Sequence, residues 1–223
     1  MKNTFLTLIV FVAISLPRVY SGELQVGFAQ LSITPDLIDQ WVDIDNDAQF
    51  NPDIDLWTDV NANGEFDAVW MAGFQNKRPA QGIKDNIMAV AAVIDDGTNR
   101  IGIVTADTVG LMRKFVLSIR QAVPQEWGLD YLMVHATHNH EGPDTQGLWG
   151  PSFFRSGVDP VYMQQLQQNI LDALSTAINN LEPAQMSMAR IPTNPLTPIK
   201  DKRRPIVIDE DIRALLFSRP DGS

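Results

Sequence analysis

The chain has 223 residues, of which 44% are hydrophobic and 20% charged, and it contains no cysteine. This composition supports a hydrophobic core and excludes a disordered tail, while the missing cysteines exclude disulfides, Cys-ligated zinc and thiol nucleophiles. The formal net charge of -10 argues against binding of a nucleic-acid backbone by bulk charge.

The N-terminus has the pattern of a secretory signal peptide. Lys2 is followed by an unbroken apolar run over residues 5–16, then by Pro17 and small residues up to Ser21. This run is shorter than the roughly 20 apolar residues that span a bilayer, so we expect a signal peptide over residues 1–21 and a secreted or periplasmic mature chain over 22–223. A buried N-terminal helix or an uncleaved anchor is the alternative.

An opening strand is predicted over residues 24–33, and the charge excess follows it. Residues 36–76 contain ten acids and no base, and the remaining chain has 17 of each. Within this segment, residues 41–51 and 57–67 repeat Trp, Asp and Phe at a constant offset of sixteen, which indicates an internal duplication.

Each copy resembles a calcium-binding loop, because oxygen ligands at alternate positions of a tight loop converge on one hard cation. The candidate ligands are Asp43, Asp45, Asp47 and Asn51 in the first copy and Asp59, Asn61, Asn63 and Asp67 in the second. Ile54 and Trp70 stand where such loops usually place a bidentate Glu, so each loop must borrow a ligand, for which Asp53 and Asp55 are candidates. We expect structural Ca²⁺; a solvated acidic loop that binds nothing is the alternative.

The remaining elements alternate between strand and helix. Apolar runs predict strands at 87–95 and 100–107, joined by a turn at 96–99, and at 129–136, 186–191 and 211–219; helical spacing predicts helices at 113–123 and from the Asp159 cap to Leu181. This order predicts an α/β fold with a mixed β-sheet layered with α-helices. Residues 220–223 have turn chemistry with no strand after them, so we expect a truncated chain or a flexible natural end.

All three histidines lie within six residues, at His135, His138 and His140. If the strand continues through them, its period of two places His138 and His140 on one face and His135 on the other. Catalytic zinc needs three protein ligands and a water, and the pair supplies two. Asp107, Glu141 and Asp144 are candidate further ligands within the chain for a catalytic metal site; a metal-free acid/base pair and a structural hydrogen-bonded cluster remain alternatives.

Three segments resemble the neutral/alkaline ceramidases, zinc amidohydrolases that split ceramide into sphingosine and a fatty acid. Residues 26–35 are similar to the family's opening motif ending in I-T-P, residues 82–94 to G-(I/L)-H-D-x-L-x-A-R-A-x-V-L, and residues 136–143 to A-T-H-T-H-S-G-P. The resemblance covers the N-terminal part of that family's catalytic domain. Lys84, Val90 and Glu141 depart from the motifs, where the family has His, Arg and Ser.

The resemblance implies roles for individual residues. His138 is expected to ligate zinc, His140 to act in catalysis, and Arg203 or Arg204 to correspond to an active-site arginine. The other zinc ligands of the family lie beyond Ser223, so these residues alone are expected to be inactive. The implied partners are a lipid amide such as ceramide and the membrane surface that carries it, without nucleic acid.

Two other classes stay open. One is a secreted, calcium-stabilised binding module without catalysis, and the other is a metal hydrolase of a different N-acyl or ester substrate. The oligomeric state is left open as well.

Overall fold

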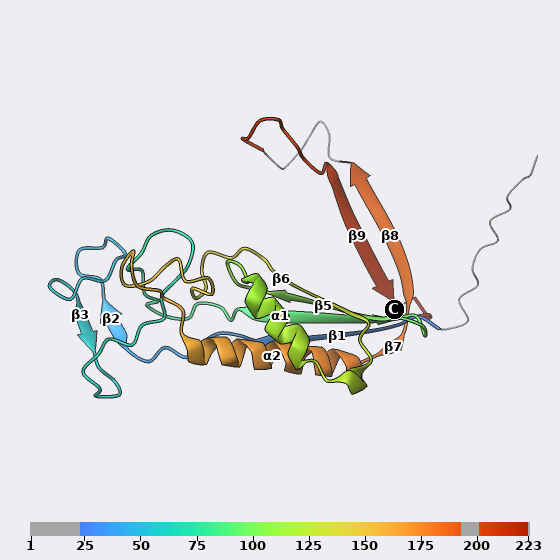
Figure 1. Cartoon of the computed structure of the whole chain (residues 1–223), viewed down its shortest axis with the longest axis horizontal. Coiled ribbons are helices and arrows are strands. Elements are labelled where there is room, and N and C mark those ends of the chain that lie inside the picture. Colours follow the sequence, from blue (N-terminus) through green and yellow to red (C-terminus); the bar gives the residue numbers. More distant parts are fainter. Residues whose placement is uncertain (1–22, 193–200, 223) are drawn as a thin grey trace, which may run out of the picture.

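The computed structural model describes residues 23–192 and 201–222. The predicted signal peptide lies outside the described residues. A five-stranded sheet forms the body of the molecule in the order β6-β5-β4-β1-β7 (Figure 1). Its strands are β1 (Gln25–Ser32), β4 (Met88–Asp95), β5 (Arg100–Ala106), β6 (Tyr131–Ala136) and β7 (Glu182–Pro183).

The sheet is mixed. Neighbouring strands are antiparallel except β5 and β6, which run parallel. Parallel strands need a crossover, and α1 (Arg113–Ala122) and a short 3-10 turn (Gln125–Trp127) lie within it. The predicted α/β fold with a mixed sheet is therefore confirmed, and β5 and β6 both end at the same edge of the sheet.

The long helix α2 (Pro160–Asn179) packs against β1, β4 and β5 (Figure 1). Its predicted cap is present, since the Asp159 carboxylate accepts a hydrogen bond from Val161 N at 2.7 Å. The helix approaches β1 so closely that a Cβ on Gly27 would lie 1.9 Å from the carbonyl oxygen of Ala177. Glycine at this position is therefore a requirement of the packing.

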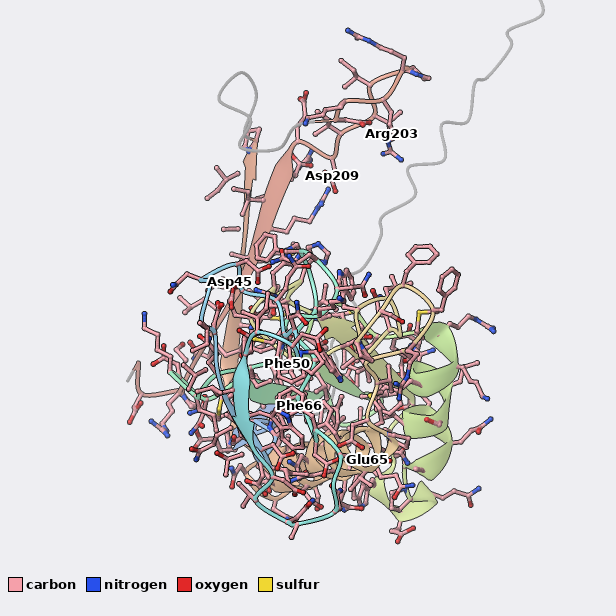
Figure 2. The ribbon with its side chains drawn as sticks, turned by 90° about the vertical axis from the view of Figure 1, so that its left-hand side faces the viewer. Asp45, Phe50, Glu65, Phe66, Arg203 and Asp209 are labelled. Carbon is pink, nitrogen blue, oxygen red and sulfur yellow. The ribbon has the colours of Figure 1, made fainter. Side chains whose placement is uncertain are left out.

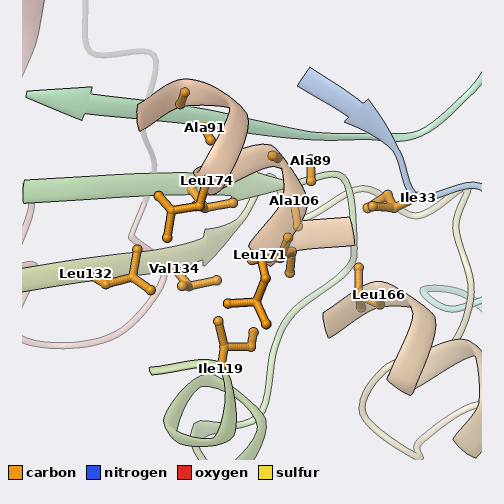
Figure 3. Close-up of a cluster of buried hydrophobic side chains, with 14 of the residues drawn as sticks. Ile33, Ala89, Ala91, Ala106, Ile119, Leu132, Val134, Leu166, Leu171 and Leu174 are labelled. Atoms are coloured by element: carbon orange, nitrogen blue, oxygen red, sulfur yellow. The ribbon is translucent and has the colours of Figure 1, made fainter. Parts of the chain in front are cut away.

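The core lies between the sheet and the two helices (Figure 3). Apolar side chains of the strands pack against apolar side chains of the two helices. The strand residues include Ala89, Ala91, Ala106, Leu132 and Val134, and the helical residues include Ile119, Leu166, Ile170, Leu171 and Leu174. The opposite sheet face is not covered by these helices, and Phe28, Val90, Tyr131 and Met133 are exposed there. No helix in the described ranges is long and apolar enough to cross a bilayer.

A two-stranded hairpin projects from the body (Figures 1 and 2). It pairs β8 (Gln185–Pro192) with β9 (Asp211–Ser218) in antiparallel register, which confirms both predicted strands. The turn expected after β9 is present, with Gly222 N donating to the carbonyl oxygen of Arg219 at 2.9 Å. The base of the hairpin touches the sheet, where the Phe28 and Phe217 rings lie 5.9 Å apart.

Candidate functional site

His138 and His140 meet in a loop at the end of β6. The strand ends at Ala136, the predicted end, and His138 has a positive φ of 66°, so the strand does not continue through the histidines and its period of two does not apply to them. The local turn nevertheless brings their Nε2 atoms to 3.2 Å and their ring centroids to 4.8 Å. Two imidazole nitrogens therefore converge on one point at the edge where β5 and β6 end.

The hydrogen bond of His138 fixes its tautomer. Its Nδ1 lies 2.7 Å from the carbonyl oxygen of Val109, which follows β5. A carbonyl oxygen only accepts, so Nδ1 carries the proton and the Nε2 of neutral His138 has a free lone pair. This is the arrangement of a metal-ligating histidine, whose second nitrogen is held by a backbone carbonyl.

His140 is packed tightly from the side of residues 72–74. A Cβ on Gly73 would lie 2.4 Å from Cγ of His140, and the backbone φ of Gly73 is 111°, so no larger residue fits there. The ring of Phe74 meets the His140 ring edge to face, with centroids 5.2 Å apart. These contacts hold the His140 ring against His138.

The other predicted partners serve different contacts. His135 hydrogen-bonds Thr105 at 2.9 Å, apart from the histidine pair. Asp107 accepts from Met88 N and the Thr137 hydroxyl. Buried Asp144 accepts the backbone N–H groups of Gln146, Gly147, Leu148, Trp149 and Gly157, which orders the following loop. Within the described ranges, no third His or carboxylate joins the pair to form a metal-binding group.

A cavity of about 790 Å³ lies beside the histidine loop. Its lining draws on all three segments with ceramidase-like motifs, including Thr34 and Pro35, residues 82–87, and Thr137, Asn139, Glu141, Gly142 and Pro143. Alternate residues of the histidine loop line it, whereas His138 and His140 do not. The three segments with ceramidase-like motifs thus lie around one cavity.

The duplicated acidic segment forms a second candidate site. Two short strands that the sequence did not predict, β2 (Gln40–Val42) and β3 (Leu56–Thr58), pair antiparallel with Trp41 opposite Trp57. Phe50 and Phe66 stack between the two loops with centroids 4.0 Å apart (Figure 2). The backbone repeats as well, with positive φ at residues 46 and 48 and again at 62 and 64.

The two copies exchange buried carboxylates. Asp55, which lies two residues before the second copy, accepts the backbone N–H groups of Ile44 and Asn51 in the first loop. Asp39 accepts those of Val60 and Asp67 in the second loop. Asp39 and Asp55 are sixteen residues apart, which is the offset of the repeat. Both side chains are buried, with 5% of Asp39 and 4% of Asp55 exposed.

The exchange completes a group of three acids. Asp43, Asp45 and Asp55 each offer a carboxylate oxygen, and these oxygens lie within 4.8 Å of one another. Desolvation, then the charges of Asp47, Asp55 and Asp43, raise the pKa of Asp45. Asp55, one of the two candidate ligands that lie between the copies, thus adds its carboxylate to those of the first loop. In the second loop, Asp67 Oδ2 accepts from the amides of Asn61 and Asn63, each at 2.7 Å.

Comparisons with known proteins identify the fold. No family model and no curated protein matches the chain. Two solved structures do: a ceramidase in complex with C2, with a TM-score of 0.62 and 16% identity, and the neutral ceramidase of Pseudomonas aeruginosa, with a TM-score of 0.59 and 17% identity. The fold is that of part of a neutral ceramidase. In both cases the match covers 91% of this chain and 30% of the ceramidase chain.

The ceramidase likeness extends over nearly the whole chain, so it is not a match to a common sheet motif alone. At this identity it shows a shared fold and leaves the chemistry to the side chains. Three residues of the two sites were missed by the sequence analysis: Val109, Gly73 and Asp39. Only Asp39 had a signal, because it precedes Trp41 by two residues as Asp55 precedes Trp57.

Proposed function

We propose that the chain is part of a secreted zinc-dependent amidohydrolase of the neutral ceramidase type. The observation that carries this proposal is the convergence of His138 and His140 at 3.2 Å, on a fold shared with ceramidases. The chain spans about 30% of the length of those ceramidases. Activity is therefore proposed for a longer protein that contains this chain, with further zinc ligands outside it.

The histidine pair fits zinc by its donor chemistry. Imidazole nitrogens are ligands that zinc prefers, and the Nε2 atoms of His138 and His140 face each other at 3.2 Å. His138 would hold the ion through Nε2, with the Val109 carbonyl fixing its ring. When bound, zinc supplies an activated water and polarises the substrate carbonyl.

His140 is proposed as the proton-transfer residue. Its Nε2 faces the same point as the Nε2 of His138, so a group held there lies within hydrogen-bond reach of both rings. In the tautomer with its proton on Nδ1, His140 can accept a proton at Nε2 from the attacking water and later donate it to the leaving nitrogen. General acid/base transfer of this kind contributes typically about 10² to 10⁴-fold in rate.

The proposed substrate is the N-acyl amide of ceramide or of a related sphingolipid, split into sphingosine and a fatty acid. The likeness to ceramidases, one of them solved with C2, supports this substrate class. Because such lipids reside in bilayers, we propose contact with a membrane surface. Glu141, in the lining of the adjacent cavity, carries a charge where the family motif has Ser and makes another N-acyl or ester substrate the alternative.

The test uses the longer protein and its His138→Ala variant. Zinc content and hydrolysis of a panel of N-acyl and ester substrates are measured with and without chelator. We expect the variant to lose both bound zinc and turnover. Retention of stoichiometric zinc with full activity would contradict the assignment, and turnover that persists in chelator would remove zinc from the proposal.

We also propose that the acidic segment binds structural Ca²⁺. The group of Asp43, Asp45 and Asp55, completed by the exchanged carboxylate, supports this because carboxylate oxygens are the ligands that Ca²⁺ prefers. Calcium titration of the chain, followed by Trp fluorescence of Trp41 and Trp57, tests it. If calcium orders the segment while zinc binds nowhere, the non-catalytic binding module becomes the better reading.

A further inference from the structure

Arg78 joins the segment at residues 72–74 to the histidine loop. Its side chain is only 12% exposed, and its Nη2 donates to the carbonyl oxygens of Ala72 and His140, the latter at 2.6 Å. A planar guanidinium presents several N–H groups in a fixed fork. Nη2 of Arg78 therefore links the backbone of Ala72 to the backbone of His140.

The same guanidinium also contacts Phe74, whose ring packs against the ring of His140. Cζ of Arg78 lies 4.9 Å from the centroid of the Phe74 ring, and that ring meets the His140 ring at 5.2 Å. A cation over an aromatic face is attracted by the ring quadrupole. Arg78, Phe74 and His140 thus form a continuous packed series that ends at the histidine pair.

Glu141 contributes little to this arrangement. Its carboxylate lies 3.5 Å from Nη1 of Arg78, but its side chain is 67% exposed. Exposed ion pairs of this kind are screened by solvent and worth little. The influence of Arg78 on the loop therefore runs through the backbone of His140 and the ring of Phe74.

We propose that Arg78 is the positioning residue that holds His140 against His138, so that the two Nε2 atoms converge. This rests on the proposed zinc function, for which the convergence is needed. Residues that orient metal-site histidines typically change metal affinity or activity by about 10 to 100-fold when removed. Arg78 touches no ring nitrogen, so it acts on the pair through position alone.

The experiment measures turnover of the N-acyl substrate and zinc content for the longer protein that contains this chain and for its variants. We expect Arg78→Met to lower turnover by about 10 to 100-fold while zinc stays bound at His138. Arg78→Lys should recover little of this, because an ammonium lacks the planar fork. Glu141→Gln should stay within about threefold of the unaltered chain.

Arg100→Met is the matched control. Arg100 is also a partly buried arginine, bound to Asp95 and to the carbonyl oxygen of Trp127, in a different part of the sheet. Its loss should reduce thermal stability but leave turnover within about twofold. An equal loss of turnover in this control would assign the Arg78 effect to general destabilisation and overturn the proposal.

A crystal structure of Arg78→Met gives a readout that does not depend on metal. We expect the separation of the two Nε2 atoms to exceed 3.5 Å, a hydrogen-bond limit. An unchanged separation overturns the positioning role, even if zinc binds the unaltered chain. Absence of zinc from the unaltered longer protein instead contradicts the proposed function, and the crystal structure then decides on Arg78 alone.

Discussion

The Nε2 atoms of His138 and His140 lie 3.2 Å apart although neither residue belongs to a strand. Their convergence depends on the positive φ of His138 and on the bond from its Nδ1 to the Val109 carbonyl. A loop can thus form a histidine pair whose Nε2 atoms face each other.

His138 and His135 should therefore differ in their effect on zinc binding by the longer protein. His138→Ala removes the ring whose tautomer is fixed, and we expect zinc affinity to fall at least about 100-fold. His135→Ala, which loses a contact with Thr105 on the other side of the strand, should stay within about twofold. Isothermal titration of both variants checks this, and equal losses would show that the pair is not the site.

The stability of the acidic segment without calcium should depend on pH. Desolvation, and then the neighbouring carboxylates, raise the pKa of Asp45 above its ordinary value of 3.8. A raised folded pKa stabilises the fold below the unfolded value, and this contribution is lost as the pH rises through the folded pKa.

In chelator, we therefore expect the segment to be more ordered near pH 4 than at pH 7, followed by Trp fluorescence. Saturating Ca²⁺ should reverse this trend, because the ion favours the charged carboxylates and competes with protons. Asp45→Asn should flatten the pH dependence in chelator. A pH profile that is the same with and without Ca²⁺ would argue against the cation site.

Asp55→Ala should destabilise the first loop. The variant leaves the partly buried N–H groups of Ile44 and Asn51 without their charged acceptor, at a cost of about 2 kcal/mol. Asp53→Ala is the control, because Asp53 is exposed and close by in sequence. Denaturant unfolding of the two variants in chelator separates them, and similar midpoints would contradict the exchange of carboxylates.

Asp144→Ala should be more damaging. The buried carboxylate accepts several backbone N–H groups of one loop, and its removal leaves them unsatisfied, so we expect a loss of about 3 to 5 kcal/mol in the free energy of unfolding. Asp144→Asn keeps one acceptor oxygen and should lose less. A neutral effect of the alanine variant would mean that the loop is ordered by other contacts.

The regular elements were predictable from local patterns. Helix α2 follows from the Asp159 cap, Pro160 and apolar residues at helical spacing, and the β4-β5 hairpin follows from the turn at residues 96–99. Strand ends agree within one or two residues. Only β2, β3 and β7 were missed, because strands of two or three residues carry no periodicity.

The sites were predictable only in part. The spacing of the histidines and of the repeated acids indicated both candidate sites. However, His138 and His140 approach each other in a loop and not on one face of a strand. That meeting depends on Val109, Gly73 and Arg78, which are distant in sequence and have no local signal. Tertiary contacts of this kind cannot be read from single residues.

The exchange of Asp39 and Asp55 makes the two acidic copies one cooperative folding unit. Neither copy contains the carboxylate that caps its own loop, so each can order only when the other is present. Calcium bound at one loop would thereby lower the entropic cost of ordering the second, and its titration curve would be steeper than that of independent sites. A peptide of residues 39–54 alone should remain unfolded at any calcium concentration that orders the pair.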